Sequence, residues 1–70
     1  MMEDVRVRFG KQLRSLREAK KLTQEGLADL AGMHFTYIGQ IERGKRNPSL
    51  INLERLAKAL KIDAGKLLPF

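Results

Sequence analysis

Side chains that can bind a polyanion are concentrated between residues 34 and 47. They are His34, Thr36, Tyr37, Gln40, Arg43, Lys45, Arg46 and Asn47. Arginine and lysine neutralise phosphates, and hydroxyl and amide groups can hydrogen-bond to phosphate oxygens or to base edges. A solvated basic surface without a partner is the alternative. The net charge of +6 over 70 residues favours a polyanion, with nucleic acid first and an anionic membrane second.

The segment that must position these side chains spans residues 23–44 and predicts two short helices joined by a tight turn. Thr23 can cap the first of them, and Gly32 suits the turn because it has no Cβ. Ile38 and Ile41 lie one helical turn apart and supply the apolar face that anchors the second helix. This arrangement is a helix-turn-helix, which places its second helix in the DNA major groove.

Four residues of that second helix share the face opposite the apolar anchor: Phe35, Thr36, Gly39 and Gln40. Gln40 can pair bidentately with adenine N6 and N7, and Thr36 can touch a thymine methyl, a base edge or a phosphate. Phe35 can pack on a thymine methyl or fold back against the core as a staple, and the sequence favours neither. Gly39 either allows a close approach to the bases or removes one contact.

The length predicts one domain over residues 1–70, and the composition narrows its class. With no cysteine and a single histidine, we expect no disulfide, no metal site and no cofactor. The apolar runs are too short for a membrane span, and no apolar signal segment follows the N-terminal charges. We therefore expect a cytoplasmic protein without a membrane partner. An enzyme is not expected, because the eight acidic residues are spread out and gather no nucleophile, base and pocket.

The apolar periodicity predicts an all-α fold of five helices without a strand. The expected helices span residues 4–20, 24–31, 35–43, 50–60 and 64–68. Asp4 suits the start of the first helix, and Ser49 and Asp63 can act as N-caps of the fourth and fifth. Gly44 can end the third helix in a left-handed conformation. Gly10 is a weak point inside the first helix, where glycine costs up to about 1 kcal/mol relative to alanine.

Residues 23–50, TQEGLADLAGMHFTYIGQIERGKRNPSL, resemble the Xre/Cro/C1 family of helix-turn-helix regulators, which includes phage repressors. The part TYIGQIERGKRNPSL is similar to the controller proteins of restriction-modification systems. The resemblance covers about residues 9–68 and is specific, because LTQE, IERG and NPSL occur in the right order and at the right spacing. It implies a compact five-helix phage-repressor-like fold, homodimers, and operators with two-fold symmetry.

Roles for individual residues follow from this resemblance. Gln24 would reach a DNA phosphate or the adjacent base, Tyr37 would support a backbone contact, and Arg46 would reach a base. Arg17 and Glu42 would form an ion pair between the first and third helices. Gln24 could instead be an ordinary exposed glutamine, and Tyr37 a half-buried aromatic residue. His34 could cap a helix or have no function, and the basic loop could be solvated without a partner. The expected phosphate ligands are Thr23, Gln24, His34, Tyr37, Arg43, Lys45 and Asn47.

The C-terminal segment is rich in apolar residues for a tail: Ile62, Leu67, Leu68 and Phe70. These side chains can close the core of the monomer or form a homodimer surface, which the resemblance supports. A dimer would place its two recognition helices about 34 Å apart, one turn of DNA.

The prediction is therefore a sequence-specific transcriptional regulator that binds double-stranded DNA as a homodimer on a palindromic operator. It would act by binding alone, either occluding or recruiting RNA polymerase, and a restriction-modification controller is its sharper form. A phage-type repressor or an antitoxin is the alternative within this class. A non-catalytic protein-interaction domain is the alternative from another class, and it predicts no salt-dependent affinity for duplex DNA.

Overall fold

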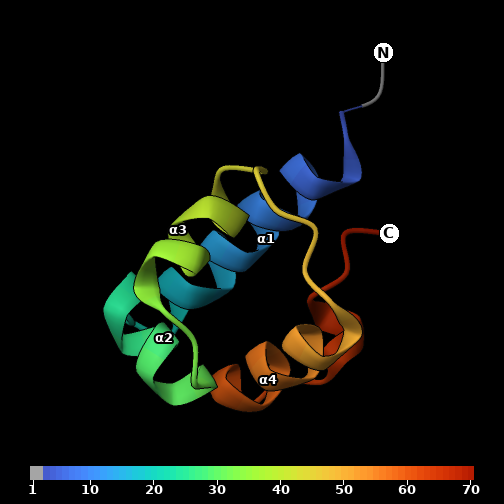
Figure 1. Ribbon diagram of the computed structural model, residues 1–70. Helices are drawn as coiled ribbons and strands as arrows, with labels where there is room; N and C mark the ends of the chain where they lie inside the picture. The colour runs from blue at the N-terminus through green and yellow to red at the C-terminus, as the bar shows by residue number, and fades with distance from the viewer. Residues whose placement is uncertain (1–2) are drawn as a thin grey trace.

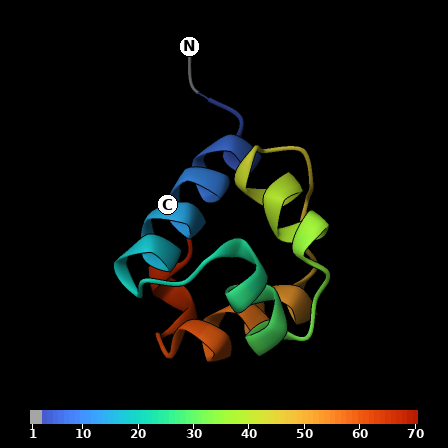
Figure 2. The same ribbon diagram turned by 90° about the vertical axis from the view of Figure 1, so that its left-hand side faces the viewer.

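The computed structural model describes residues 3–70, in which helices surround one core (Figure 1, Figure 2). The elements are α1 (Val5–Ala19), α2 (Gln24–Ala31), α3 (Phe35–Glu42), α4 (Leu50–Leu60) and a 3-10 helix, η1 (Ala64–Lys66). Over this range the chain is all-α, without a strand, as predicted. The first two residues of the predicted domain lie outside the described part. No described helix is long and apolar enough to cross a membrane.

The predicted fifth α-helix is wrong. Residues 64–66 form a single 3-10 turn, in which the Lys66 amide donates to the Asp63 carbonyl and the Leu67 amide to the Ala64 carbonyl. Asp63 makes no side-chain cap. The chain after this turn carries Leu67 into the core, and Pro69 has no N–H with which to continue a helix. Residues 3–70 therefore form four α-helices rather than five.

The other helix boundaries follow local signals. α2 and α4 have the predicted bounds, while α1 is one residue shorter at each end and α3 is one residue shorter at its C-terminus. Gly44 is left-handed, with φ +75°, and follows the C-cap of α3. Three of the expected caps form, because backbone amides donate at 2.8, 2.9 and 3.1 Å to the side chains of Asp4, Thr23 and Ser49. The caps of Thr23 and Ser49 are each worth about 1 kcal/mol.

The core lies where the helices meet, and α3 takes a central place in it. α3 packs on both α1 and α2, while α4 packs on α2 and on η1. The largest side chains that are fully buried are Leu13, Leu27, Ile38, Ile41, Leu56, Leu60 and Leu67. Each contributes about 1.5–3 kcal/mol by leaving water. The orientation of α3 is therefore fixed from two sides.

The structure explains why position 10 is a glycine, which the helix pattern did not reveal. A Cβ at this position would lie 2.5 Å from the Ile41 carbonyl oxygen and 2.6 Å from that of Glu42. Glycine thus lets α1 cross the C-terminal end of α3 at backbone contact. A Cβ at Gly44 would likewise lie 2.8 Å from Cγ2 of Val7. Both glycines bring the loop after α3 against α1.

Candidate nucleic-acid interface

α3 presents one apolar face inward and one polar face outward. Ile38 and Ile41 are fully buried, which places the opposite side of the helix at the surface. Thr36 is exposed there and Gln40 is half-buried. The predicted orientation of the second motif helix is therefore present in the structure.

The N-terminus of α3 is capped by a histidine. Nδ1 of His34 accepts from the Thr36 amide at 3.1 Å, which leaves Nε2 as the donor of the neutral ring. The His34 ring stacks on Phe35, with 4.9 Å between the ring centroids. Phe35 is 47% exposed and lies outside the core, so the staple alternative for it is wrong. An apolar ring therefore remains at the surface at the start of the helix.

Gly39 does not line the open face, and its predicted place there is wrong. The residue is buried, and a Cβ would lie 3.2 Å from Nη1 of Arg43 and 3.3 Å from Oε1 of Gln24. These two long side chains cover it, because Gly39 lies on the flank of α3 that faces the start of α2. Its small size makes room for Gln24 between the two helices.

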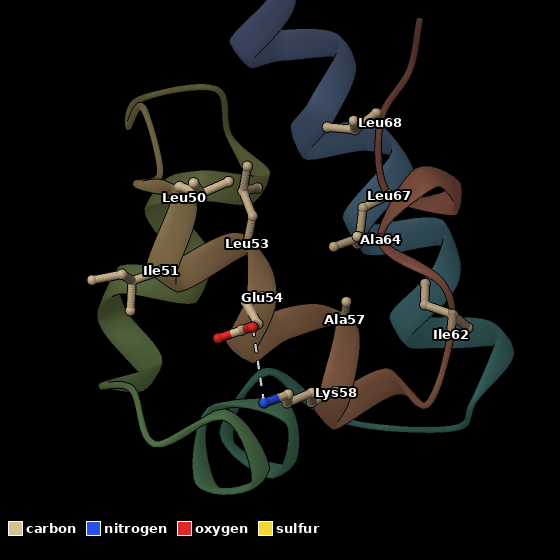
Figure 3. Close-up of a pocket in the computed structure, with 10 residues that line it drawn as sticks. All are labelled: Leu50, Ile51, Leu53, Glu54, Ala57, Lys58, Ile62, Ala64, Leu67 and Leu68. Atoms are coloured by element: carbon tan, nitrogen blue, oxygen red, sulfur yellow. Dashed lines mark ion pairs between the residues drawn. The ribbon is translucent and has the colours of Figure 1, made fainter.

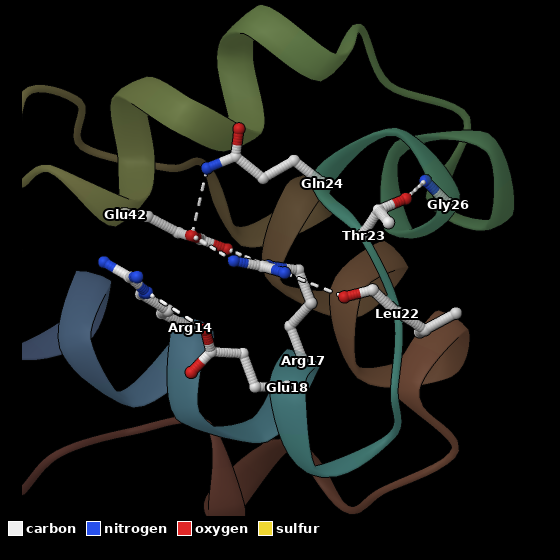
Figure 4. Close-up of polar contacts among 8 residues, drawn as sticks. All are labelled: Arg14, Arg17, Glu18, Leu22, Thr23, Gln24, Gly26 and Glu42. Atoms are coloured by element: carbon white, nitrogen blue, oxygen red, sulfur yellow. Dashed lines mark hydrogen bonds and ion pairs between the residues drawn. The ribbon is translucent and has the colours of Figure 1, made fainter.

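Gln24 belongs to a polar network that joins three helices (Figure 4). Arg17 of α1 contacts Glu42 of α3 at two points, Nε to Oε2 at 2.6 Å and Nη2 to Oε1 at 3.0 Å. Gln24 of α2 donates from Nε2 to the same Oε1 at 3.2 Å. Nη1 of Arg17 donates to the Leu22 carbonyl at 2.8 Å. The hydrogen bond to Glu42 raises the pKa of Arg17 above its ordinary range.

This ion pair is the one that the family resemblance implied. The side chain of Arg17 is 10% exposed and that of Glu42 is 3% exposed. Two buried charges thus satisfy each other, and the pair ties α1 to the end of α3. The Glu42 carboxylate also holds the side-chain amide of Gln24 in place. Gln24, Thr23 and Phe35 together line a shallow groove at the N-terminus of α2.

A second cluster joins α3, the following loop and α4. Nε of Arg46 donates to Oε1 of Gln40 at 2.9 Å, and its guanidinium carbon lies 5.7 Å from the centre of the Tyr37 ring. Asn52 of α4 donates from Nδ2 to the Tyr37 hydroxyl at 3.2 Å. Arg46, the exposed end of this chain of contacts, is therefore held against α3.

The loop after α3 carries positive charge without acidic partners. Arg43, Lys45 and Arg46 are exposed, and in residues 3–70 none of them forms an ion pair. Asn47 is exposed beside them. The polar face of α3 and this basic loop thus form one surface, which suits the edges of bases flanked by phosphates. The part of the chain that is described holds no group of three metal-ligating side chains.

The four C-terminal residues predicted at a dimer surface differ in their exposure. Leu67 is fully buried, so its predicted place on a dimer surface is wrong, and it completes the monomer core under α4. Ile62 is half-buried against the same core. Phe70 is 80% exposed and Leu68 is partly exposed.

The sequence interpretation missed an apolar surface at the start of α4. Leu50 is 83% exposed and Ile51 is 64% exposed, although Leu50 fits the apolar stripe of its helix. With Leu53 and Ala57 they line a groove whose other wall is the chain from Ile62 to Leu68 (Figure 3). A signal existed, because Ile51 is a large apolar residue off the stripe of α4.

The profile of the HTH_3 helix-turn-helix family matches residues 13–67, which hold α2, α3 and most of the packed core. The chain belongs to this family. Helix-turn-helix regulators of this kind bind double-stranded DNA and are not enzymes.

Several proteins similar to this helix-turn-helix regulator are named control or controller proteins. Control protein C.BamHI of Bacillus amyloliquefaciens is 44% identical over 71 residues, which cover 100% of this chain and 88% of that protein. Control protein C.MunI of Mycoplasma is 43% identical over 94% of this chain and 90% of its own length. The crystal structure of the restriction-modification controller protein C.AhdI from Aeromonas hydrophila superposes with a TM-score of 0.89, at 51% identity, over 90% of this chain and 96% of that one.

Proposed function

We propose that this regulator is a restriction-modification controller protein that binds, as a homodimer, an operator with two-fold symmetry. The observation that carries this proposal is the polar face of α3, continuous with a basic loop and fixed in direction by Ile38 and Ile41. Relatives that carry the name control protein and align with 100% and 94% of the chain support the controller role.

Base edges meet the centre of this surface in the proposed complex. Thr36 and Arg46 supply hydroxyl and guanidinium groups, with the Gln40 amide against Arg46, and Phe35 supplies an apolar ring for a thymine methyl. Gly39 carries no side chain for this task and is covered. Phosphates meet the periphery, where the donors are Thr23, Gln24, His34 through Nε2, Tyr37, Arg43, Lys45 and Asn47.

A second copy of the chain covers the apolar groove beside α4 in this proposal. Leu50, Ile51 and Leu68 expose apolar surface that one protomer leaves in contact with water. Glu54 and Lys58 lie on its rim, and a two-fold axis can set Glu54 of one copy opposite Lys58 of the other. Phe70 adds apolar surface next to Leu68.

The mechanism is binding alone. Bound to an operator, the dimer either occludes RNA polymerase or recruits it, and no bond in the DNA is broken. Residues 1–70 form one domain in this proposal, and that domain acts without catalysis in the bacterial cytoplasm, where its operator is.

Selection from a pool of random duplexes tests this proposal. The expected motif has two half-sites related by two-fold symmetry, with centres about 10–10.5 base pairs apart. Binding that is independent of salt and enriches no sequence would contradict it and favour a protein-interaction domain.

A further inference from the structure

We propose that Gln40 is a positioning residue, which holds Arg46 in the geometry for reading a base instead of reading one itself. The inference rests on the proposed DNA-binding function and deepens it. It starts from the hydrogen bond that Arg46 donates from Nε to Oε1 of Gln40 at 2.9 Å.

The chemistry of the pair fixes the orientation of the Gln40 amide. An arginine Nε can only donate, so the atom of Gln40 that faces it must be the oxygen. The adenine pair needs this oxygen as an acceptor for N6–H, together with the amide NH₂ as a donor to N7. Arg46 therefore already occupies one of the two lone pairs of the oxygen with which Gln40 would recognise adenine, and it fixes the direction of that amide.

The same contact leaves the outer edge of Arg46 available. Nε binds Gln40, while none of the side-chain hydrogen bonds found within residues 3–70 involves Nη1 or Nη2 of Arg46. Two parallel N–H groups match O6 and N7 of guanine, the commonest base contact of arginine. The geometry thus assigns guanine, not adenine, to this part of the surface.

Arg46 needs such support because of its place in the chain. It lies in the loop after α3, is exposed, and has a long side chain with many rotamers. The Tyr37 ring restrains one side of its guanidinium, at 5.7 Å, and Asn52 restrains that ring through the hydroxyl. Gln40, on α3, supplies the second restraint. The side chain is then ordered before DNA arrives, so less freedom is lost on binding.

Base preferences of five proteins test the assignment: wild type, Gln40→Ala, Gln40→Glu, Arg46→Ala and the double variant Gln40→Ala/Arg46→Ala. We expect Arg46→Ala to reduce discrimination at one base step by about 5- to 150-fold. Gln40→Ala should reduce discrimination at the same base step by about three- to tenfold. The double variant should discriminate no less than Arg46→Ala alone. Gln40→Glu should keep the preference, because a carboxylate still accepts from Nε but cannot donate to adenine N7.

Nitrogen-15 relaxation of the Arg46 Nε in the free protein provides a readout without DNA. Gln40→Ala should make this N–H more mobile, whereas Gln40→Glu should not. Lys11→Ala is the control for both measurements, because Lys11 is 68% exposed on α1, contacts Glu3 and has no part in either proposed surface.

The inference is overturned if Gln40→Ala changes a different base step from Arg46→Ala, if its effect adds in the double variant, or if Gln40→Glu loses as much as Gln40→Ala. Unchanged Nε mobility in Gln40→Ala would overturn it as well. In each of these cases the wild-type motif survives, and so does the proposed function. A wild-type protein that selects no motif would overturn the proposed function itself.

Discussion

The guanidinium of Arg17 lies against the carboxylate of Glu42 in a two-point contact, 2.6 Å from Nε to Oε2 and 3.0 Å from Nη2 to Oε1. The pair joins the last turn of α1 to the last residue of α3, and its carboxylate also accepts from Gln24. The polar face of α3 therefore owes its direction to a buried charge pair as well as to Ile38 and Ile41.

Breaking this pair should be costly. Arg17→Met leaves the Glu42 carboxylate buried without a counter-charge, which should lower the free energy of unfolding by about 3–5 kcal/mol. Arg14→Met is the matched control, because Arg14 pairs with Glu18 at the surface and should cost about 1 kcal/mol or less. Urea unfolding followed by circular dichroism measures both. Equal small losses would mean that the Arg17 pair is as exposed in solution as the Arg14 pair.

Gly10→Ala should destabilise the protein although alanine is the better helix former. The new Cβ would lie within 2.6 Å of two backbone oxygens of α3, so the helices must move apart, at a cost of about 1–3 kcal/mol. Gly65→Ala is the control, because its Cβ meets nothing within 4 Å. Thermal unfolding measures both changes. A Gly10→Ala protein that melts higher than wild type would contradict the close crossing of α1 over α3.

Lys45→Ala should weaken binding to every duplex alike. Loss of one phosphate contact should reduce the magnitude of the slope of log K against log salt by about 1, without changing the selected motif. Lys11→Ala removes the same charge outside the proposed DNA and dimer surfaces and should leave the slope unchanged. Titrations at several salt concentrations give the slopes. If the two variants behave alike, Lys45 lies off the DNA.

The stabilising contribution of the Asp4 cap of α1 should depend on pH. The side-chain hydrogen bond from Arg6, helped by its backbone amide, lowers the pKa of Asp4 from 3.8 to about 2. A lowered pKa means that the charged cap stabilises the fold above about pH 3.8 and that this contribution is lost as the pH falls through about 2.

Carbon-13 NMR of the Asp4 carboxyl group should give a midpoint near 2. In Arg6→Ala, which lacks the largest cause of the shift, the midpoint should move toward 3.8. The same midpoint in both proteins would show that the Arg6 side chain does not bind Asp4 in solution.

Ile51→Glu should separate the proposed dimer. A charge on this exposed residue would be buried at the interface of the two copies, so the variant should sediment as a folded monomer and bind the full operator weakly. Leu30→Glu is the control, because Leu30 is 61% exposed on α2 and does not line the groove. A dimeric Ile51→Glu protein would place the interface elsewhere.

Local chemistry determined much of this protein from its sequence alone. The bounds of α2 and α4 and the caps Thr23 and Ser49 were predictable, because each depends on neighbours within one helical turn. The inward direction of α3 was predictable for the same reason, since the spacing of Ile38 and Ile41 sets it. The Arg17–Glu42 pair was predicted from family resemblance and not from spacing.

Tertiary structure decided what depends on residues far apart in the chain. Only the packing of α2 against α3 shows that Gln24 and Arg43 cover Gly39. Only the return of the chain after α4 shows that Leu67 enters the core while Leu50 stays outside. A helical pattern predicts which side chains share a face, but the neighbouring elements determine how much of that face remains exposed.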